Sequence, residues 1–456
     1  MIDSTHSRLQ QHPLDALQRF LLARLHDTPS VRTLVIAFSA GPDSLALLLA
    51  AAQIAPAMGY RLRALHVHHG LHPDADLWAA KAIEQAAAVN VPCTVLSVTV
   101  AAQANIEAAA RQARYDALAQ AMLSDEALVL AHHQDDQAET VLLRLMRGAG
   151  LNGLKAMEPT SEWILPSGHR LAKWRPWLAL PRQAIEQWFE EAKVGLQRAK
   201  LSLPITTFCP VQDPANSDAR YARTLLRSQV LPLLEGRWPE AKTLLARSAE
   251  QLAQQSHALS TLADYWLSIH ARRDHLLAST LTTLDAASLQ AVISRWLQQQ
   301  ACSPLPAAYW PRVQTELLAS RADANPMLHW SNVSLRRYRD GLYLVKDAEL
   351  IQAVPEIAWV NPQETLAWAG QIWLPPILPS EHPLWQQAWR IAPRRGGERW
   401  RPAGRYHHVL LKHWCQEQAI PPWQRQALWC LWAGDIIVKV GLTNGLSWSS
   451  TTLSDL

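Results

Sequence analysis

The chain has 456 residues, of which 49% are hydrophobic, and a formal charge of +4 at pH 7. This length predicts two to four domains, and the weak positive charge permits a polyanionic partner without requiring one. The apolar stretch Leu45–Ala52 is too short to span a bilayer, and the first 25 residues lack a basic start followed by an apolar run. We therefore expect a cytoplasmic protein with no membrane attachment. The five cysteines are scattered without a C-x-x-C pair, which argues against a disulfide framework or a thiolate metal cluster.

Strand-like and helix-like segments alternate through the first third of the chain. A leucine stripe predicts a helix over 14–25, and buried strands are then predicted at 33–39, 61–69, 93–100 and 126–133, with helices at 44–54, 78–89, 106–122 and 137–146. This alternation predicts an α/β fold with a parallel sheet covered on both faces. Ligands of such sheets bind at the carboxyl ends of the strands, where three polar clusters fall: Ser39–Ser44, His66–Gly70 and His132–Asp136.

The rest of the chain has a different texture. Residues 182–194 form an amphipathic helical pattern, and residues 226–300 are mostly apolar-periodic and helical. From about residue 330, short strands such as "GLYLV" and "DIIVKVG" are separated by proline and tryptophan. We predict a catalytic nucleotide-binding domain at 1–225, a mainly helical middle domain at 226–350, and a small α+β C-terminal domain at 351–456.

The turn "SAGPDS", Ser39–Ser44, joins the first strand to its helix. Unpaired N–H groups at a helix N-terminus attract phosphate, and Gly41 lets the backbone approach it closely. The first lysine of the chain is Lys81, so this is not a loop of the G-x-x-x-x-G-K-[ST] type. Charge on bound phosphates would then be met by Mg²⁺ anchored on Asp43, by backbone amides and by arginines. An ordinary turn in which Ser39 or Asp43 caps the helix fits the six residues equally well.

The second and third clusters contain histidines and acids. In "HVHHGL", His66 and His69 favour loop structure and adenosine contact over zinc, because no cysteine or carboxylate has the spacing of a closed site. In "AHHQDDQAET", Asp135, Asp136 and Glu139 crowd the first turns of a helix. Capping needs fewer acids, so the surplus suits a metal, an ammonium group or a catalytic base. The His-His-Asp-Asp run also leaves a metal hydrolase as an alternative.

A charged stripe lies on the helix predicted at 106–122. Glu107 and Arg111 are four residues apart, and Arg114 follows three residues after Arg111. A solvated salt-bridged face explains this stripe. The alternative is that one of the arginines lies over a triphosphate and supplies the cation that the loop lacks.

Together these motifs resemble those of known enzymes. "SAGPDS" is similar to the S-G-G-x-D-S loop of the PP-loop ATP pyrophosphatases, with Ala40 in place of the first glycine. If Ala40 adopts a positive φ, its methyl group costs roughly 1 kcal/mol. The wider set resembles the tRNA(Ile)-lysidine synthase family over roughly residues 30 to 235, with a weaker likeness near the C-terminus. The stretches that carry it are "SAGPDS", "HVHHGL", "IEAAARQARY", "AHHQDDQAET", "RGAGLNGL", "RPWL" and "DPANSDARYARTLLRSQVLP". A second departure is Thr224, where the family usually has asparagine.

This resemblance implies a ligase that uses ATP and Mg²⁺. AMP is transferred to the C2 oxygen of the wobble cytidine (position 34) in a tRNA(Ile) with a CAU anticodon, and L-lysine then attacks C2, forming lysidine. The family pattern implies lysine binding by Asp136 and Glu139, and catalysis by these two with Asp43, Arg111 and Arg114. ATP would be bound by Ser39, Ala40, Gly41, Pro42, Asp43, Ser44, His66 and His69.

A basic run in the C-terminal part suits the tRNA partner. It holds seven basic residues against one acid, Glu398, over residues 390–413, and Trp400 and Tyr406 are interleaved with it for base stacking. We predict phosphate contacts from Arg394, Arg395, Arg399, Arg401, Arg405 and Lys412. A solvated face is the alternative for this run. A homodimer is left open by the sequence. The competing functions are another PP-loop tRNA-modifying or AMP-forming enzyme, and a tRNA-binding homologue that has lost catalysis.

Overall fold

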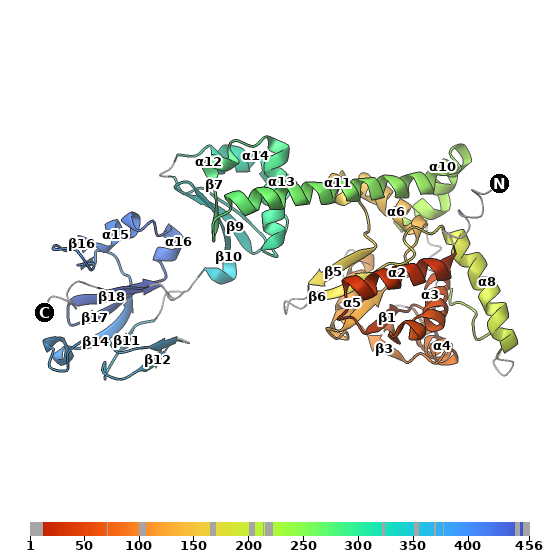
Figure 1. Cartoon of the computed structure of the whole chain (residues 1–456), viewed down its shortest axis with the longest axis horizontal. Coiled ribbons are helices and arrows are strands. Elements are labelled where there is room, and N and C mark those ends of the chain that lie inside the picture. The colour runs from red at the N-terminus through yellow and green to blue at the C-terminus, as the bar shows by residue number, and fades with distance from the viewer. Residues whose placement is uncertain are drawn as a thin grey trace. The chain divides into compact units, whose positions relative to one another are not determined.

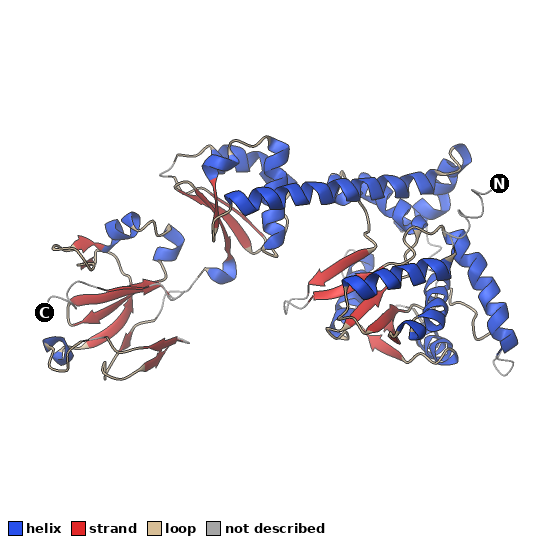
Figure 2. Ribbon diagram, viewed as in Figure 1, coloured by secondary structure: helices blue, strands red, loops and turns tan. Residues whose placement is uncertain are grey.

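The computed structural model describes residues 12–70, 72–99, 106–164, 170–199, 206–212, 214, 222–321, 324–350, 355–368, 371–376, 378–442 and 447–449. The chain divides into two compact units, Met1–Ala258 and Leu259–Leu456. Helices and strands alternate in the first unit, and antiparallel strands predominate toward the end of the second (Figures 1 and 2). No described helix is both long and apolar enough to cross a membrane.

The first unit is built on a six-stranded sheet in the order β3-β2-β1-β4-β6-β5. Five neighbouring strands are parallel, and β5 joins the edge in the antiparallel direction. The strands are β1 (Thr33–Ala37), β2 (Arg61–His68), β3 (Cys93–Ser97), β4 (Glu126–Val129), β5 (Thr160–Ile164) and β6 (Arg170–Trp174). The predicted α/β class with a parallel sheet is confirmed. The hairpin of β5 and β6 was not predicted from the sequence.

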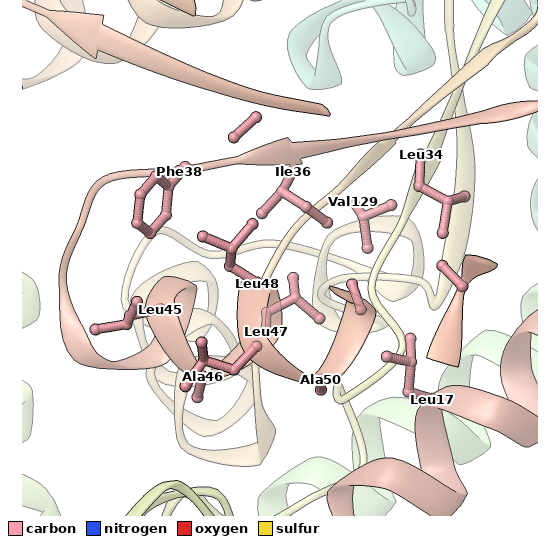
Figure 3. Packing of buried hydrophobic residues seen from close by; sticks show 14 of the residues in the cluster. Leu17, Leu34, Ile36, Phe38, Leu45, Ala46, Leu47, Leu48, Ala50 and Val129 are labelled. Atoms are coloured by element: carbon pink, nitrogen blue, oxygen red, sulfur yellow. The ribbon is translucent and has the colours of Figure 1, made fainter. Parts of the chain in front are cut away.

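Helices cover both faces of this sheet because β1 is apolar on both sides. Leu34, Ile36 and Phe38 face a core shared with α2 and α3 (Figure 3). Val35 and Ala37 face a second core, to which α5 contributes Leu118. The helices of this unit are α2 (Pro13–Asp27), α3 (Pro42–Ile54), α4 (Ala75–Ala88), α5 (Ile106–Gln120), α6 (Gln134–Leu145), α7 (Leu151–Leu154), α8 (Arg182–Ala199), α9 (Ala222–Leu225) and α10 (Leu231–Arg237).

A π-helix, Leu226–Val230, lies between α9 and α10, and α11 (Ala241–His270) follows. Because α9, the π-helix and α10 are continuous, the side chains of Arg223 and Arg227 are carried on one helical rod. Both reach α6, where Arg223 contacts Thr140 and Arg227 contacts Glu139. This rod therefore packs beside one of the three polar clusters that the sequence singles out.

The second unit has a four-stranded antiparallel sheet, β7-β10-β9-β8, and a five-stranded sheet, β11-β14-β17-β18-β19. The first sheet packs in a hydrophobic cluster around Leu335, and the second packs in two clusters, one around Ile391 and one around Cys430. The expected strands at "GLYLV" and "DIIVKVG" are β10 (Gly341–Lys346) and β18 (Ile436–Leu442). The helical middle region thus also contains a sheet.

The remaining elements of the second unit are short, apart from α13. They are β7 (His275–Leu277), α12 (Ala278–Leu281), α13 (Ala286–Gln299), α14 (Trp310–Arg312), a π-helix (Val313–Leu318), β8 (Met327–Trp330), β9 (Val333–Tyr338), β11 (Ile357–Ala358), β12 (Leu366–Trp368), β13 (Gln371–Trp373), β14 (Trp389–Pro393), β15 (Arg399–Trp400), β16 (Val409–Leu410), α15 (Leu411–Glu417), α16 (Pro422–Arg425), β17 (Leu428–Ala433) and β19 (Ser447–Ser449).

The packing of α3 on the sheet yields a stability prediction. Leu47 is 0% exposed in the core beneath β1, whereas Leu77 is 67% exposed on α4. We expect Leu47→Ala to lower the free energy of unfolding of the first unit by about 3 kcal/mol, because it leaves a cavity. Leu77→Ala should change it by less than about 0.5 kcal/mol. Hydrogen exchange of β1 peptides in rising urea measures both, and equal effects would contradict this account of the core.

Candidate active site

Three loops meet at the carboxyl ends of β1, β2 and β4. The loop Ser39–Ser44 leads from β1 into α3, whose N-cap is Gly41. Hydroxyl groups hold it: the Ser39 and Ser44 Oγ atoms are 3.0 Å apart, and Ser44 Oγ donates to the Gly41 carbonyl at 3.1 Å. A Cβ added at Gly41 would lie 3.3 Å from Ser39 Oγ, so a side chain there would crowd this network. The loop places the N-terminus of α3, an apolar helix of 13 residues, at the carboxyl ends of the strands.

Ala40 is left-handed, with φ of 59°. Its side chain is 0% exposed, and its carbonyl accepts a hydrogen bond of 2.9 Å from the Val211 amide. A methyl group at this φ costs roughly 1 kcal/mol relative to glycine. Of the two conformations considered for Ala40, the strained one is therefore present, and it explains why a glycine suits this position in the related loops.

His133 connects the loop after β1 with the loop after β4. It is 1% exposed, and its Nδ1 accepts a hydrogen bond from the Asp136 amide in a capping box at the start of α6. Its Nε2 lies 3.7 Å from Asp43 Oδ2 and 3.4 Å from Asp136 Oδ2. Burial lowers the pKa of His133, but Asp43, Asp136 and Asp135 outweigh burial and raise it. The imidazole thereby holds two carboxylates of the site close together.

Asp43 lies at the centre of this group. Burial raises its pKa, but the neighbouring His133, Arg182 and Arg227 outweigh burial and hold the pKa below its usual value. Its Oδ1 is buried and accepts no hydrogen bond from the described residues, with Arg182 Nε at 3.6 Å. The carboxylate is therefore ionised, and its Oδ1 is ion-paired with Arg182 without accepting a hydrogen bond from it. No group of three or more His, Cys, Asp or Glu side chains suited to a metal ion occurs in the described part of the chain.

Asp135 and Asp136 point to different partners. Asp135 accepts hydrogen bonds from Lys242 Nζ at 2.8 Å and from the Arg182 amide at 3.1 Å, and these contacts outweigh burial and lower its pKa. Asp136 instead accepts from the His133 amide at 3.1 Å and from Arg227 Nη2 at 3.3 Å. Asp135 is thus a structural anchor for α11, whereas Asp136 faces the phosphate loop through His133.

Glu139 is the deepest acid of the site. It is 0% exposed, and burial raises its pKa although Arg227 donates to its Oε1 at 2.7 Å. Its Oε2 is also buried and accepts no hydrogen bond from the described residues. A buried carboxylate oxygen without a donor is costly unless a ligand donates to it. Glu139 therefore has a place for one further hydrogen-bond donor.

The predicted histidine and arginine ligands lie around these acids. His66 is 5% exposed with Nδ1 3.0 Å from the Phe38 carbonyl, and burial lowers its pKa. His69 is half-buried on the same loop. The charge of Arg114 contributes to lowering the pKa of both His66 and His132, so it lies within electrostatic reach of two loops. Arg111 is exposed and lies over the Tyr115 ring, 5.2 Å from its centroid.

Sequence reasoning missed two cations of the site, Arg227 and Arg182. Arg227 lies on the π-helix and bridges Glu139 and Asp136, while Arg182 opens α8 and lies beside Asp43. In the sequence, only their position near motifs marks these two arginines. Arg227 falls inside the stretch "RTLLRSQ", and Arg182 follows "RPWLALP". Residues 213 and 215–221 of the same motif lie outside the described residues.

The basic run of the C-terminal part is largely ion-paired. Arg394 lies 3.7 Å from the Glu398 carboxylate, Arg405 lies 2.6 Å from Glu417, and Arg395 pairs with Glu356. Arg399 and Lys412 are exposed, Arg401 is half-buried, and Tyr406 is 96% exposed. Trp400 is 1% exposed and packs edge-on against Trp414, so the expectation that it stacks on a base is wrong. It fills a core instead.

Comparison with known proteins agrees with this geometry. The PP-loop domain family matches residues 15–234, the TilS substrate binding domain matches 276–343, and the TilS substrate C-terminal domain matches 389–453. The tRNA(Ile)-lysidine synthase of Xanthomonas axonopodis pv. citri (strain 306) is 36% identical over 429 residues, covering 89% of this chain and 88% of that protein. The enzymes of that name from Methylococcus capsulatus (strain ATCC 33009 / NCIMB 11132 / Bath) and Serratia proteamaculans (strain 568) are 33% and 35% identical, each over 90% of this chain and 91% of theirs.

The parallel sheet and the loop at the start of α3 define a PP-loop, ATP-binding enzyme. Similarity at this level extends through the substrate binding and C-terminal domains. The chain belongs to the tRNA(Ile)-lysidine synthase family.

The strain at Ala40 gives a prediction for the loop. Ala40→Gly removes a cost of roughly 1 kcal/mol, but it also removes a buried methyl worth about 0.8 kcal/mol. We expect the free energy of unfolding to change by less than about 1 kcal/mol, and the rate of ATP-dependent AMP formation to be equal or higher. Steady-state kinetics and urea unfolding measure the two. A large loss of rate would mean that the methyl group itself supports the nucleotide loop.

Proposed function

We propose that this chain carries out the reaction of its family: ATP-dependent formation of lysidine on tRNA(Ile), with release of AMP and pyrophosphate. The finer steps are those implied by the sequence resemblance, namely AMP transfer to C2 of the wobble cytidine and attack by L-lysine. The observation that carries the proposal is the contact network between the phosphate loop and the acids of α6. His133 lies within 3.7 Å of Asp43 and within 3.4 Å of Asp136.

The nucleotide would bind over the start of α3. Backbone N–H groups and the positive end of the helix dipole favour its phosphates, and Ser39 and Ser44 add hydroxyl donors. His66 and His69, on the neighbouring loop, would contact the adenosine. Arg111 and Arg114 would stabilise charge that develops on the phosphate oxygens during AMP transfer. Ala40, Gly41 and Pro42 shape the turn between these groups.

Asp43 fits a magnesium ion. Its ionised carboxylate has a buried oxygen without a hydrogen-bond donor among the described residues. Mg²⁺ is typically held by one or two carboxylates together with substrate phosphates, so one acid at the loop suffices. A bound ion would neutralise phosphate charge, while His133 and Arg182 hold the Asp43 side chain in place.

The amine of L-lysine would bind between Asp136 and Glu139. Glu139 Oε2 is a buried acceptor without a donor among the described residues, which suits the ammonium group of the substrate. The amine must lose a proton before it attacks, and burial raises the pKa of Glu139, which makes its carboxylate a stronger base. Arg227 offsets part of the negative charge and so keeps this buried pair stable without substrate.

The tRNA would be held partly by the C-terminal part. Arg394, Arg395, Arg399, Arg401, Arg405 and Lys412 remain the proposed phosphate contacts. Several already pair with carboxylates, but exposed ion pairs are worth only about 0–1 kcal/mol, so phosphates can replace these partners. Tyr406 is 96% exposed and is the proposed stacking residue. Another PP-loop activity, or a lapsed homologue, is not favoured by family membership over about 90% of the chain.

The test uses the purified full-length chain with ATP, L-lysine and unmodified tRNA(Ile). We expect AMP and pyrophosphate to form together with a lysine-dependent increase in the mass of the wobble nucleoside. Omission of lysine should abolish the mass shift. If AMP forms at the same rate without lysine and the tRNA mass does not change, the proposal fails.

The two neighbouring aspartates of α6 make a matched pair of variants. We expect Asp136→Asn to lower the rate of lysidine formation by at least about a hundredfold, because the charge that holds the amine is lost. Asp135→Asn should keep the rate within about tenfold and lower the free energy of unfolding by about 1 kcal/mol, because it weakens the Lys242 contact. Single-turnover assays and urea unfolding measure both. Equal losses of rate would contradict separate roles for the two acids.

A further inference from the structure

A group of cations beside His132 has no role in the function proposed above. It consists of Arg144, Lys173 and Arg175, bordered by Arg111 and Arg223, and is called the β6 cation cluster below. Arg175 follows the last residue of β6, and β6 pairs with β4, which in turn pairs with β1. The cluster therefore lies at the same carboxyl-end edge as the phosphate loop, but two strands away from it.

Neutral groups hold the guanidinium groups of this cluster. Arg175 is 6% exposed, and its side chain donates to the Glu158 carbonyl at 2.7 Å and approaches His132 Nδ1 at 3.3 Å. Arg144 donates to the carbonyls of Gly153 and Ala156 at 2.7 and 2.9 Å. These acceptors orient the cations without neutralising their charge.

Aromatic rings hold the ammonium group of Lys173. Its Nζ lies 5.4 Å from the centroid of the Tyr115 ring and 5.5 Å from that of Trp163. Alternation along β6 places Lys173 and Arg175 on the same face as Leu171, which packs with Leu118 of α5. The ammonium group thus faces the α5 side of the sheet, between α5 and β5.

The cations repel one another. Burial, followed by the charges of Arg175 and Arg111, lowers the pKa of Lys173 from 10.5 to about 8. Burial and the charges of Arg111 and Arg223 likewise lower the pKa of Arg144. The Glu158 carboxylate offsets part of the charge on Arg175, but it is also paired with Lys155 at 2.8 Å. Among the described residues, no carboxylate lies within ion-pair distance of Arg144, Lys173 or Arg175.

Three other cations near the site are paired with acids. Arg227 pairs with Glu139 and Asp136, Lys242 with Asp135, and Arg182 with Asp43 and Glu186. Among the described residues, positive charge without an ion-paired carboxylate is therefore found beside β6. A partly buried group of like charges is costly by itself and is stabilised when an anion binds.

We propose that the β6 cation cluster is a binding site for a phosphodiester of the RNA substrate, next to the nucleotide that enters the active site. This inference rests on the proposed function, because it takes the substrate to be an RNA loop. The phosphates of ATP bind at the start of α3 on β1, and the acids that receive the amine lie beyond β4. The β6 cation cluster lies at the next strand end beyond β4, where an RNA strand whose target base reaches these acids would meet it. The shared ligand chemistry is a phosphoryl anion, and released pyrophosphate is its other source.

Lys173 is the residue to change, since it is half-buried and Arg175 is more deeply embedded in the fold. The probe is a 17-nucleotide anticodon stem-loop with the CAU anticodon, titrated against the full chain at several salt concentrations. We expect Lys173→Gln to weaken binding about three- to tenfold and to reduce the slope of log affinity against log salt by ~0.7. The control is Lys81→Gln on α4, whose lysine pairs with Glu84 at 3.1 Å and should leave the slope unchanged.

The pH dependence separates a charge contact from a structural role. Phosphate favours the charged lysine, so above the lowered pKa of Lys173, about 8, binding must take up a proton. Affinity of the parent protein for the stem-loop should fall about two- to fivefold between pH 7 and pH 9. Lys173 faces Arg111 and Tyr115 on α5, Trp163 on β5 and Arg175 on β6. Lys173→Arg should keep the affinity at pH 7 and lose most of this pH dependence.

Two results would overturn the phosphodiester site. One is a Lys173→Gln protein that binds the stem-loop with unchanged affinity and salt slope. The other is a Lys173→Gln protein in which inorganic pyrophosphate no longer competes with ATP while RNA binding is unchanged. That result would assign the cluster to the pyrophosphate leaving group. Failure of the proposed function is distinguishable, because the parent protein would then form no lysidine, whatever the variant does to the salt slope.

Discussion

The contact between His133 and the carboxylates of Asp43 and Asp136 is the interaction on which the site depends. Asp43 belongs to the loop after β1, and Asp136 to the helix after β4, so the imidazole joins two neighbouring crossovers of the sheet. Two ionised acids this close together would repel, and the Nε2 of His133 lies between them, 3.7 Å from Asp43 Oδ2 and 3.4 Å from Asp136 Oδ2. The same ring caps α6 and so fixes the direction of its acids. The loop after β1 and the acids of α6 are thereby held together at the carboxyl ends of the strands.

Two kinds of cation surround this centre, and their partners distinguish them. Arg182 reaches the acids from α8, Arg227 from the π-helix and Lys242 from α11, and they compensate buried negative charge. The β6 cation cluster is held by carbonyl groups and aromatic rings and keeps its charge. The first group stabilises the folded site, whereas the second creates positive potential toward a substrate. The β6 cation cluster lies two strands away from the phosphate loop in the same sheet, and this distance separates the two groups of cations.

Much of the fold follows from local patterns, and less of the site does. The alternation that predicts strands and helices reflects burial on both faces of a parallel sheet, and the three polar clusters meet because carboxyl ends of such strands share an edge. Arg227 could not be placed in the same way, because it reaches Glu139 from 88 residues further along the chain, on a π-helix that has no local sequence signal. The hairpin of β5 and β6 was also missed, and with it the surroundings of Lys173. The prediction that Trp400 stacks on a base was wrong, because its position among arginines in the sequence does not show whether its side chain is exposed.

The hydrogen bonds of the α6 carboxylates show which of their oxygens are already engaged within the fold. Asp135 receives the Arg182 amide on one oxygen and Lys242 on the other. Asp136 receives Arg227 on one and the His133 amide on the other, and Glu139 receives Arg227 on Oε1. Of these three carboxylates, only Glu139 has an oxygen, Oε2, that accepts no hydrogen bond from the described residues. Any further donor that enters among these three carboxylates would therefore find in Glu139 Oε2 an oxygen that it does not share with a described residue.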